Sequence, residues 1–313
     1  MMVTAALLLL GALTAVVAPR LLARAAWADR EPVVALWVWQ CVVAAVLLCC
    51  VVSMALSAAA AWTVVRVRVF APAPEAVVEA YALDSAGSWA MATTVALACG
   101  GLWTGAMLVR EVVRARRQQQ RRHAELWLRA PLLPGEKPGG DRLVVVEGER
   151  PDAWWLAGPA PRLVITTAAL RRLEGRQVDA VVAHEQGHAR ARHHWLLRCS
   201  AALAGGFPRV PVFAAFREEM HRLVELAADD TAARRHGRLT VALALVGLNE
   251  DRGVFGPCPT PEDHVPQRVH RLLSPPQRLT PVRRLRLTAC AVLAPAVPVL
   301  VAFVPGWRAL GGL

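Results

Sequence analysis

Residues 183–194 read AHEQGHARARHH and contain the pattern HExxH from His184 to His188. In an α-helix, residues four apart lie one turn apart on the same face, so both imidazoles can reach a single metal ion. Histidine nitrogens are common zinc ligands. Glu185 follows the first histidine, and its carboxylate can take a proton from a water that the metal activates. The pattern therefore predicts a zinc-dependent hydrolytic centre on a long helix over residues 176–197.

A solvated basic helix is the alternative interpretation of the same stretch. It fits the later part well, at Arg190, Arg192, His193 and His194. It fits His184 poorly, because that residue follows the apolar run VDAVVA, which is expected to point into a protein core. We therefore expect the first half of the helix to face inward and the second half to be solvated.

A zinc site needs a third protein ligand. The stretch REEMHRLVELAADDTAARRHG, residues 217–237, predicts a second helix, on which Glu225 and Asp229 lie one turn apart. Apolar residues flank Glu225, and such surroundings disfavour an unpaired carboxylate. We expect Glu225 to be the third ligand and Asp229 to accept the free ring N–H of a zinc histidine.

Two other histidines are candidates near this site. His194 could be the third ligand if the chain turned back after His188, but Ala191 at the midpoint makes a left-handed turn costly. We therefore expect His194 on a solvated face. His221, one turn before Glu225, could line the cleft, although an ordinary position on the helix surface is the expectation.

The composition indicates an integral membrane protein. Of 313 residues, 55% are hydrophobic, and the mean hydropathy is +0.37, which is high for a soluble domain. Apolar stretches long enough to cross a bilayer cover residues 3–23, 33–62, 88–109 and 287–306. The net charge of +12 comes largely from arginines beside these stretches, so we expect the lipid bilayer as a partner and no direct nucleic-acid binding.

The distribution of arginine predicts the topology. The run REVVRARRQQQRRH follows the third span, and QRLTPVRRLRL precedes the fourth. The positive-inside rule then places the N-terminus outside and residues 111–286 in the cytoplasm. The apolar segment 195–216 is interrupted by glycines and prolines. A crossing there would put the two site helices on opposite sides of the membrane, so we expect a bent flap that packs on the domain or dips into the near leaflet.

Strand-like runs precede the site. They cover residues 142–147, 153–158 and 162–167 and are rich in β-branched and aromatic residues. The predicted fold class is an α-helical membrane protein with a cytoplasmic α+β zincin-like metallopeptidase domain. Its parts are a region with three spans (1–110), a basic juxtamembrane helix and linker (111–140), the zinc metallopeptidase domain (141–286), and a final span with a short tail (287–313).

Three motifs resemble known proteins. PDAWWLAGPAPRLVITTAALRRL, AVVAHEQGHARARHH and LVELAADDTAA occur in the order seen in membrane-embedded gluzincin metallopeptidases. The lead-in resembles the HtpX-like membrane proteases, and the arrangement of spans is similar to that of the BlaR/MecR antibiotic-sensor peptidases. The resemblance implies zinc held by His184, His188 and Glu225, Glu185 as the general base, and Asp229 as the hydrogen-bond partner of a ligand.

The sequence departs from these families in two places. No penicillin-binding sensor with an SxxK motif follows the fourth span, so we expect that the chain does not itself sense a β-lactam. The HtpX-like proteases carry His–Pro followed by an arginine, whereas EDHVPQRVHRLLSPP has His264 and Arg268 at a different spacing. Either residue could stabilise the oxyanion, and a structural role for this helix is the alternative.

The expected function is a membrane-bound zinc-dependent endopeptidase that cleaves a cytoplasmic protein. Its substrate would be a protein or peptide, extended along an edge strand of the small sheet. The BlaR/MecR resemblance implies a winged-helix repressor as the first candidate. The alternatives are an HtpX-like quality-control protease and a non-catalytic membrane signalling adaptor. An enzyme should lose its function when the metal is removed or Glu185 is replaced by Gln, whereas an adaptor should depend on neither.

Overall fold

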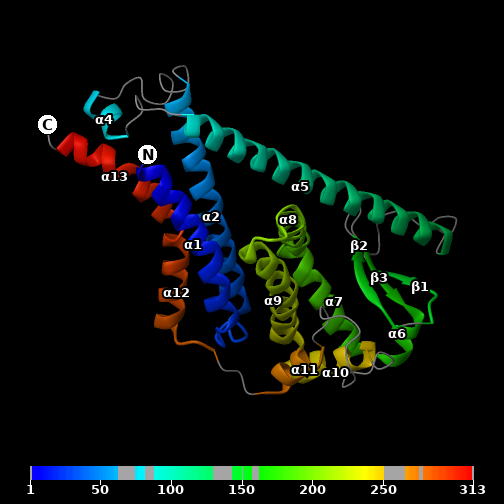
Figure 1. The fold of residues 1–313 in the computed structure, drawn as a ribbon. Coiled ribbons are helices and arrows are strands. Elements are labelled where there is room, and N and C mark those ends of the chain that lie inside the picture. Colours follow the sequence, from blue (N-terminus) through cyan, green and yellow to red (C-terminus); the bar gives the residue numbers. More distant parts are fainter. Residues whose placement is uncertain are drawn as a thin grey trace. The chain divides into compact units, whose positions relative to one another are not determined.

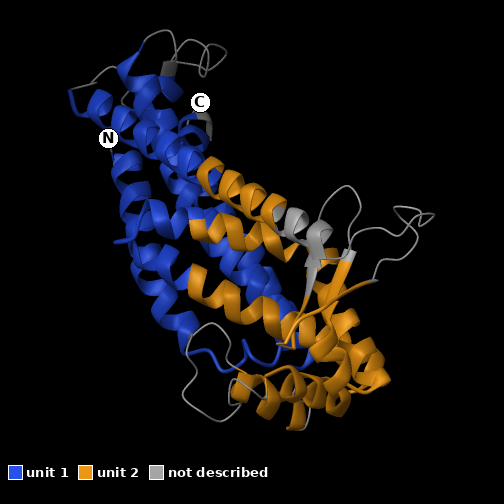
Figure 2. Cartoon of the chain, turned by 90° about the vertical axis from the view of Figure 1, so that its right-hand side faces the viewer, with its two compact units in different colours: residues 1–108, 202–216, 279–313 blue, residues 109–201, 217–278 orange. Residues whose placement is uncertain are grey.

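The computed structural model of the chain describes residues 2–62, 75–81, 88–129, 143–149, 151–156, 162–249, 265–274 and 278–311. The chain divides into two compact units, coloured separately in Figure 2. Unit 1 comprises residues 1–108, 202–216 and 279–313, and unit 2 comprises residues 109–201 and 217–278.

Unit 1 contains the long apolar helices (Figure 1). Within the described part of the chain, three are long and apolar enough to cross a membrane: α1 (Met2–Ala23), α2 (Pro32–Ala61) and the Ser88–Gln118 part of α5 (Ser88–Arg129). Their outer faces carry exposed apolar side chains such as Leu9 and Leu102, which hydrocarbon solvates better than water does. These helices fit the membrane protein that the composition predicts, and the orientation stays a prediction.

The C-terminal part of unit 1 is a bent helix pair. The helices α12 (Pro281–Leu293) and α13 (Ala296–Gly311) meet at an angle of 51° and together are a fourth candidate span. The short helix α4 (Glu75–Ala80) packs against α13, and the Tyr81 hydroxyl next to it donates a hydrogen bond of 2.6 Å to the Ala302 carbonyl.

The basic juxtamembrane run continues the third span without a break. One helix, α5, covers both the apolar stretch and the arginine-rich stretch that follows it. Helix formers such as Ala, Arg and Gln predominate after Val113, and neither glycine nor proline interrupts the helix after Gly105. The predicted linker at 130–140 lies outside the described residues.

Residues 202–216 form the tip of a helical hairpin within unit 1. The helix α8 (His193–Gly206) ends before Pro208, and α9 (Pro211–His236) begins with a proline at its first position. At the tip, the Trp103 indole N–H donates to the Gly206 carbonyl at 2.9 Å, and the Phe216 ring lies 6.4 Å from that of Trp39. The predicted bent flap is therefore a helix–turn–helix that packs on α2 and α5.

Unit 2 is mostly helical and contains one small sheet. The strands β1 (Leu143–Val146), β2 (Ala153–Leu156) and β3 (Arg162–Thr166) lie where the sequence predicts strands. Their order is β1-β3-β2; β1 runs parallel to β3 and β2 antiparallel to it. Because helices dominate the unit, the predicted α+β character is not confirmed.

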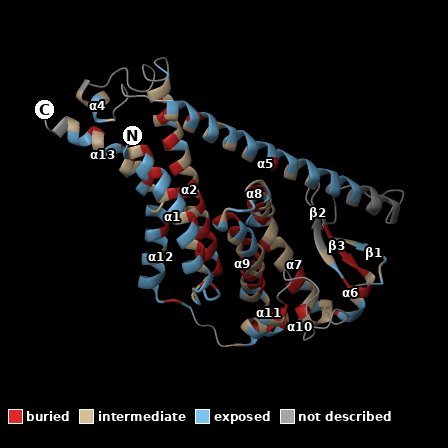
Figure 3. Cartoon of the chain, viewed as in Figure 1, coloured by how far each residue is buried: buried red, intermediate tan, exposed pale blue. Residues whose placement is uncertain are grey.

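The core of unit 2 joins the sheet to the helices. Figure 3 shows β3 buried, and its Ile165 packs with Ala169 of α6 (Thr167–Arg172) and Val181 of α7 (Gly175–Arg190). A second cluster connects α7 and α9 with α10 (Arg238–Asn249) and α11 (Val265–Leu273). Its buried members are Ala180, Ala183, Ala232, Val241, Ala242, Leu245, Val265, Val269 and Leu272.

The predicted continuous helix over 176–197 is wrong. The helix α7 ends at Arg190, and α8 begins at His193. Between them Arg192 has a φ of +53°, which is in the left-handed region. A non-glycine residue there costs about 1–2 kcal/mol, so tertiary packing must favour the turn. The break redirects the chain immediately after the HExxH motif.

Candidate metal centre

Helices α7 and α9 carry the site and approach each other closely. The N-terminus of α7 is fixed by the Gln177 side chain, which accepts the Glu174 backbone N–H at 3.2 Å. Gly187 faces α9, and a Cβ at that position would lie 3.4 Å from the Cα of Ala228. A bulky residue in place of this glycine would separate the two helices, so the glycine within HExxH lets α9 come within reach of the histidines.

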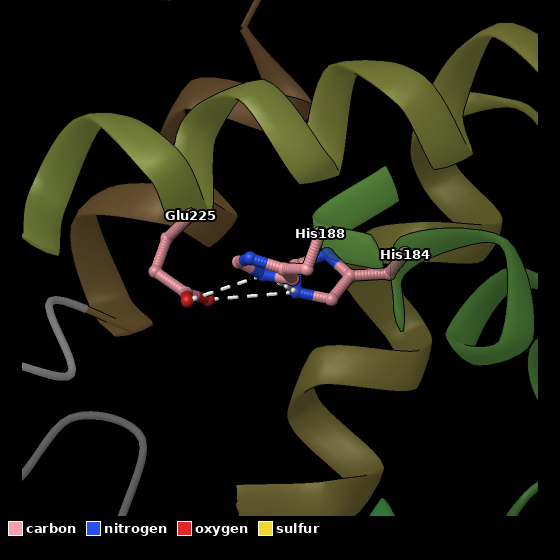
Figure 4. A group of neighbouring side chains, drawn as sticks. All are labelled: His184, His188 and Glu225. Carbon is pink, nitrogen blue, oxygen red and sulfur yellow. Dashed lines mark hydrogen bonds and ion pairs between the residues drawn. The ribbon is translucent and has the colours of Figure 1, made fainter. Parts of the chain in front are cut away.

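His184, His188 and Glu225 converge on one point (Figure 4). The Nε2 atoms of His184 and His188 lie 3.1 Å apart, and they are 3.5 Å and 3.3 Å from the two Glu225 carboxylate oxygens. A tetrahedral zinc ion with ligands at about 2.0–2.1 Å would separate its ligand atoms by about 3.3 Å. The three predicted ligands are therefore brought together in an arrangement that fits zinc.

Asp229 lies behind the first histidine. Its side chain has no solvent exposure, and its Oδ1 is 3.0 Å from His184 Nδ1. Such a contact keeps the proton of a neutral imidazole on Nδ1 and leaves the Nε2 lone pair for a metal. Burial lowers the pKa of His184, because it disfavours the charged ring. Hydrogen bonds to Asp229 and Glu225 have the larger combined effect and raise the pKa of His184 to about 10 when no metal is bound.

Arg268 of α11 binds both carboxylates of the site. Its Nε and Nη2 donate to Asp229 at 2.8 and 2.7 Å, and its Nη1 lies 2.9 Å from Glu225 Oε2. Burial raises the pKa of Asp229, but the Arg268 guanidinium prevails and holds it at about 2. The same guanidinium and the two histidines keep the pKa of Glu225 well below its usual range, again against burial. Both carboxylates are therefore ionised at neutral pH.

Arg268 therefore contacts the carboxylates of both Asp229 and Glu225, and it also lines the cavity beside them, so its role as an oxyanion stabiliser stays a prediction. The same two helices meet again one turn away, where Arg271 donates to both oxygens of Asp230 at 2.8 and 3.0 Å. The other oxyanion candidate, His264, lies outside the described residues.

A cavity of about 150 Å³ opens beside the cluster. Glu185 lines it together with His184 and Glu225, so the predicted general base shares this space with two of the three candidate ligands. The α10 part of the lining is mostly apolar, with Asn249 as its polar member. The cavity is lined there by Val241, Ala244, Leu245 and Leu248, and at the start of β2 by Pro151, Asp152 and Ala153.

His193 corrects the expectation of a solvated second half of the motif. Its side chain is buried, with 4% exposure, and its Nδ1 lies 3.0 Å from His188 Nδ1. The two rings meet edge to face at 83°. Burial and the neighbouring His188 lower the pKa of His193 to about 4, so its ring is neutral. The sequence carries no signal for this contact, because it depends on the turn at Arg192.

His194 and His221 do not belong to the group of candidate metal ligands among the described residues. His194 contacts the Trp195 ring, with the ring centroids 6.1 Å apart. His221 is half-buried on α9 and is absent from the described residues that line the cavity.

Comparison with known proteins agrees with this geometry. Residues 116–261, somewhat less than half of the chain, match the family model for peptidase family M48. No curated protein and no solved structure matches the chain. The matched segment contains His184, His188 and Glu225. Residues 116–261 are therefore similar to the M48 peptidases, which are generally zinc-dependent, and support a metallopeptidase of the membrane type.

Proposed function

We propose that the protein is a membrane-bound zinc-dependent endopeptidase. The observation that carries the proposal is the convergence of the His184, His188 and Glu225 ligand atoms at 3.1–3.5 Å, beside a cavity that Glu185 also lines. The family match over residues 116–261 supports the same class of enzyme. The apolar helices of unit 1 support attachment to a membrane.

In this proposal, His184, His188 and Glu225 hold the zinc ion. When bound, zinc supplies Lewis-acid polarisation of the scissile carbonyl and makes a neighbouring water more acidic. The carboxylate of Glu185 takes a proton from the attacking water and delivers it to the leaving amide nitrogen. Asp229 accepts the Nδ1–H of His184 and keeps its ring in place.

The substrate in this proposal is a peptide segment in an extended conformation. The strand order β1-β3-β2 makes β2 an edge strand, and Pro151, Asp152 and Ala153 at its start line the cavity. A peptide that pairs with β2 would pass beside the metal ligands, held by main-chain hydrogen bonds. The apolar wall from α10 would then receive one of its side chains.

The cytoplasm is the proposed location of unit 2, because arginines cluster at the corresponding ends of the spans. A winged-helix repressor is the first candidate substrate, by resemblance to the BlaR/MecR proteins. A reporter that is active only in the cytoplasm should work when fused near Gly139 and fail when fused near Ala73. The reverse pattern would place the metal site outside the cell.

The decisive experiment is metal analysis of the detergent-purified chain together with a peptidase assay. We expect one zinc per chain, lost in His184→Ala, His188→Ala and Glu225→Ala. Glu185→Gln should keep the zinc and lose proteolysis, because only the proton acceptor changes. Full zinc content in Glu225→Ala would refute the ligand set. Unchanged proteolysis in Glu185→Gln would refute the catalytic role.

A further inference from the structure

His193 occupies a place beside the metal cluster that the proposed mechanism does not use. It is the first residue of α8 and follows the left-handed Arg192, so the turn points its ring back toward α7. The ring is buried, and its Nδ1 lies 3.0 Å from the Nδ1 of His188.

The direction of this hydrogen bond follows from the position of His188. Its Nε2 faces the other ligand atoms, 3.1 Å from His184 Nε2 and 3.3 Å from Glu225 Oε1. A metal bound there needs the lone pair of Nε2, so the ring proton of neutral His188 must be on Nδ1. His188 therefore donates from Nδ1–H, and Nδ1 of His193 accepts.

Each of the two candidate ligand histidines then has a hydrogen-bond partner at its Nδ1. The Nδ1 of His184 lies 3.0 Å from a carboxylate oxygen of Asp229, and the Nδ1 of His188 lies 3.0 Å from a ring nitrogen of His193. We propose that His193 is a positioning residue that fixes the ring orientation and the tautomer of His188 for metal binding. This inference rests on the proposed zinc site and adds a residue to it.

The local backbone supports this role. A left-handed arginine is sterically unfavourable, and a continued helix would avoid that strain. The turn at Arg192 directs His193 inward, while the adjacent His194 points to Trp195. Two neighbouring histidines thus differ in surroundings, and His194 provides a matched control.

The test is a competition titration of zinc against a chromogenic chelator, using the full chain in detergent. His193→Asn places an amide oxygen close to the position of Nδ1 and should keep nearly wild-type affinity. His193→Gln carries its amide one carbon farther out, and His193→Leu has no acceptor. Both should bind zinc about 10–100-fold more weakly, the usual effect of losing a partner of a metal ligand. His194→Ala should bind like the wild type.

A second readout separates positioning from simple packing. Cobalt(II) in place of zinc should give a wild-type visible spectrum in His193→Asn and an altered one in His193→Gln. The metal-free forms of these two polar variants should unfold at similar temperatures. Equal zinc affinity of the Asn and Gln variants would overturn the inference, and so would wild-type affinity in the Leu variant. A wild-type chain that binds no zinc would instead refute the proposed function.

Discussion

Replacing Arg268 with methionine should destabilise the protein far more than the same change at Arg271. Both arginines extend from α11 and bind an aspartate of α9. Asp229 has no solvent exposure, whereas Asp230 is 23% exposed. Removing one partner of a buried pair costs about 3–5 kcal/mol, and a fully exposed pair contributes at most about 1 kcal/mol. The partly buried Arg271–Asp230 pair lies between these limits. Because His184 still contacts Asp229, we expect the lower value, about 3 kcal/mol, for Arg268→Met.

Urea titrations of the metal-free, detergent-solubilised protein, followed by tryptophan fluorescence, would measure both losses. A double variant, Asp229→Asn with Arg268→Met, removes the fully buried one of the two carboxylate charges that Arg268 neutralises and should recover part of the stability lost in the single variant. If Arg268→Met and Arg271→Met lost the same stability, burial would not govern these pairs. A double variant no more stable than Arg268→Met would refute the electrostatic explanation.

Gly187→Ala should change the free energy of unfolding by less than about 1 kcal/mol, whereas Gly187→Leu should cost about 1–3 kcal/mol by forcing α7 from α9. Equal effects in urea titrations would contradict the close approach of these helices. Asp229→Asn should be less stable than the wild type at neutral pH, and thermal unfolding should show the gap closing as the pH falls through 3.8 toward about 2. Folding lowers the pKa of this carboxyl, so its contribution exists above the unfolded value and is lost in acid; a gap independent of pH would be inconsistent with this. Arg238→Ala should cost about 1–3 kcal/mol, because the guanidinium donates to the carbonyls of Leu272 and Ser274 at the end of α11. The exposed Arg235→Ala is its control, and similar losses in the two variants would exclude this capping role.

The sequence predicts the parts of the site that depend on helical periodicity. His184 and His188 share a face because they are four residues apart, and Glu225 and Asp229 do so for the same reason. The apolar residues around them indicate which faces turn inward. Burial of one face against another then brings the two pairs together. The choice of Glu225 over His194 as the third candidate ligand depends on the structure, which groups Glu225 with the two histidines.

The contacts that sequence reasoning missed depend on tertiary structure. Ala191 and Arg192 are good helix formers, and neither glycine nor proline marks the turn between α7 and α8. The burial of His193 offsets the strain of the left-handed Arg192. This burial can be recognised only once the positions of the surrounding helices are known. For Arg268, the sequence identifies the residue as a candidate but not its partner. Its contacts with Asp229 arise from packing between segments that are distant in the sequence.

The α8–α9 hairpin determines how the protein can be divided for biochemical work. A fragment spanning residues 109–278 would contain every described ligand, yet it would also contain residues 202–216, which belong to unit 1. Val212, Phe213 and Phe216 are buried in the intact chain. Without residues 1–108 and 279–313 their apolar surface would face water and favour aggregation. Detergent should therefore be required even for this fragment, which retains only residues 109–118 of the candidate spans.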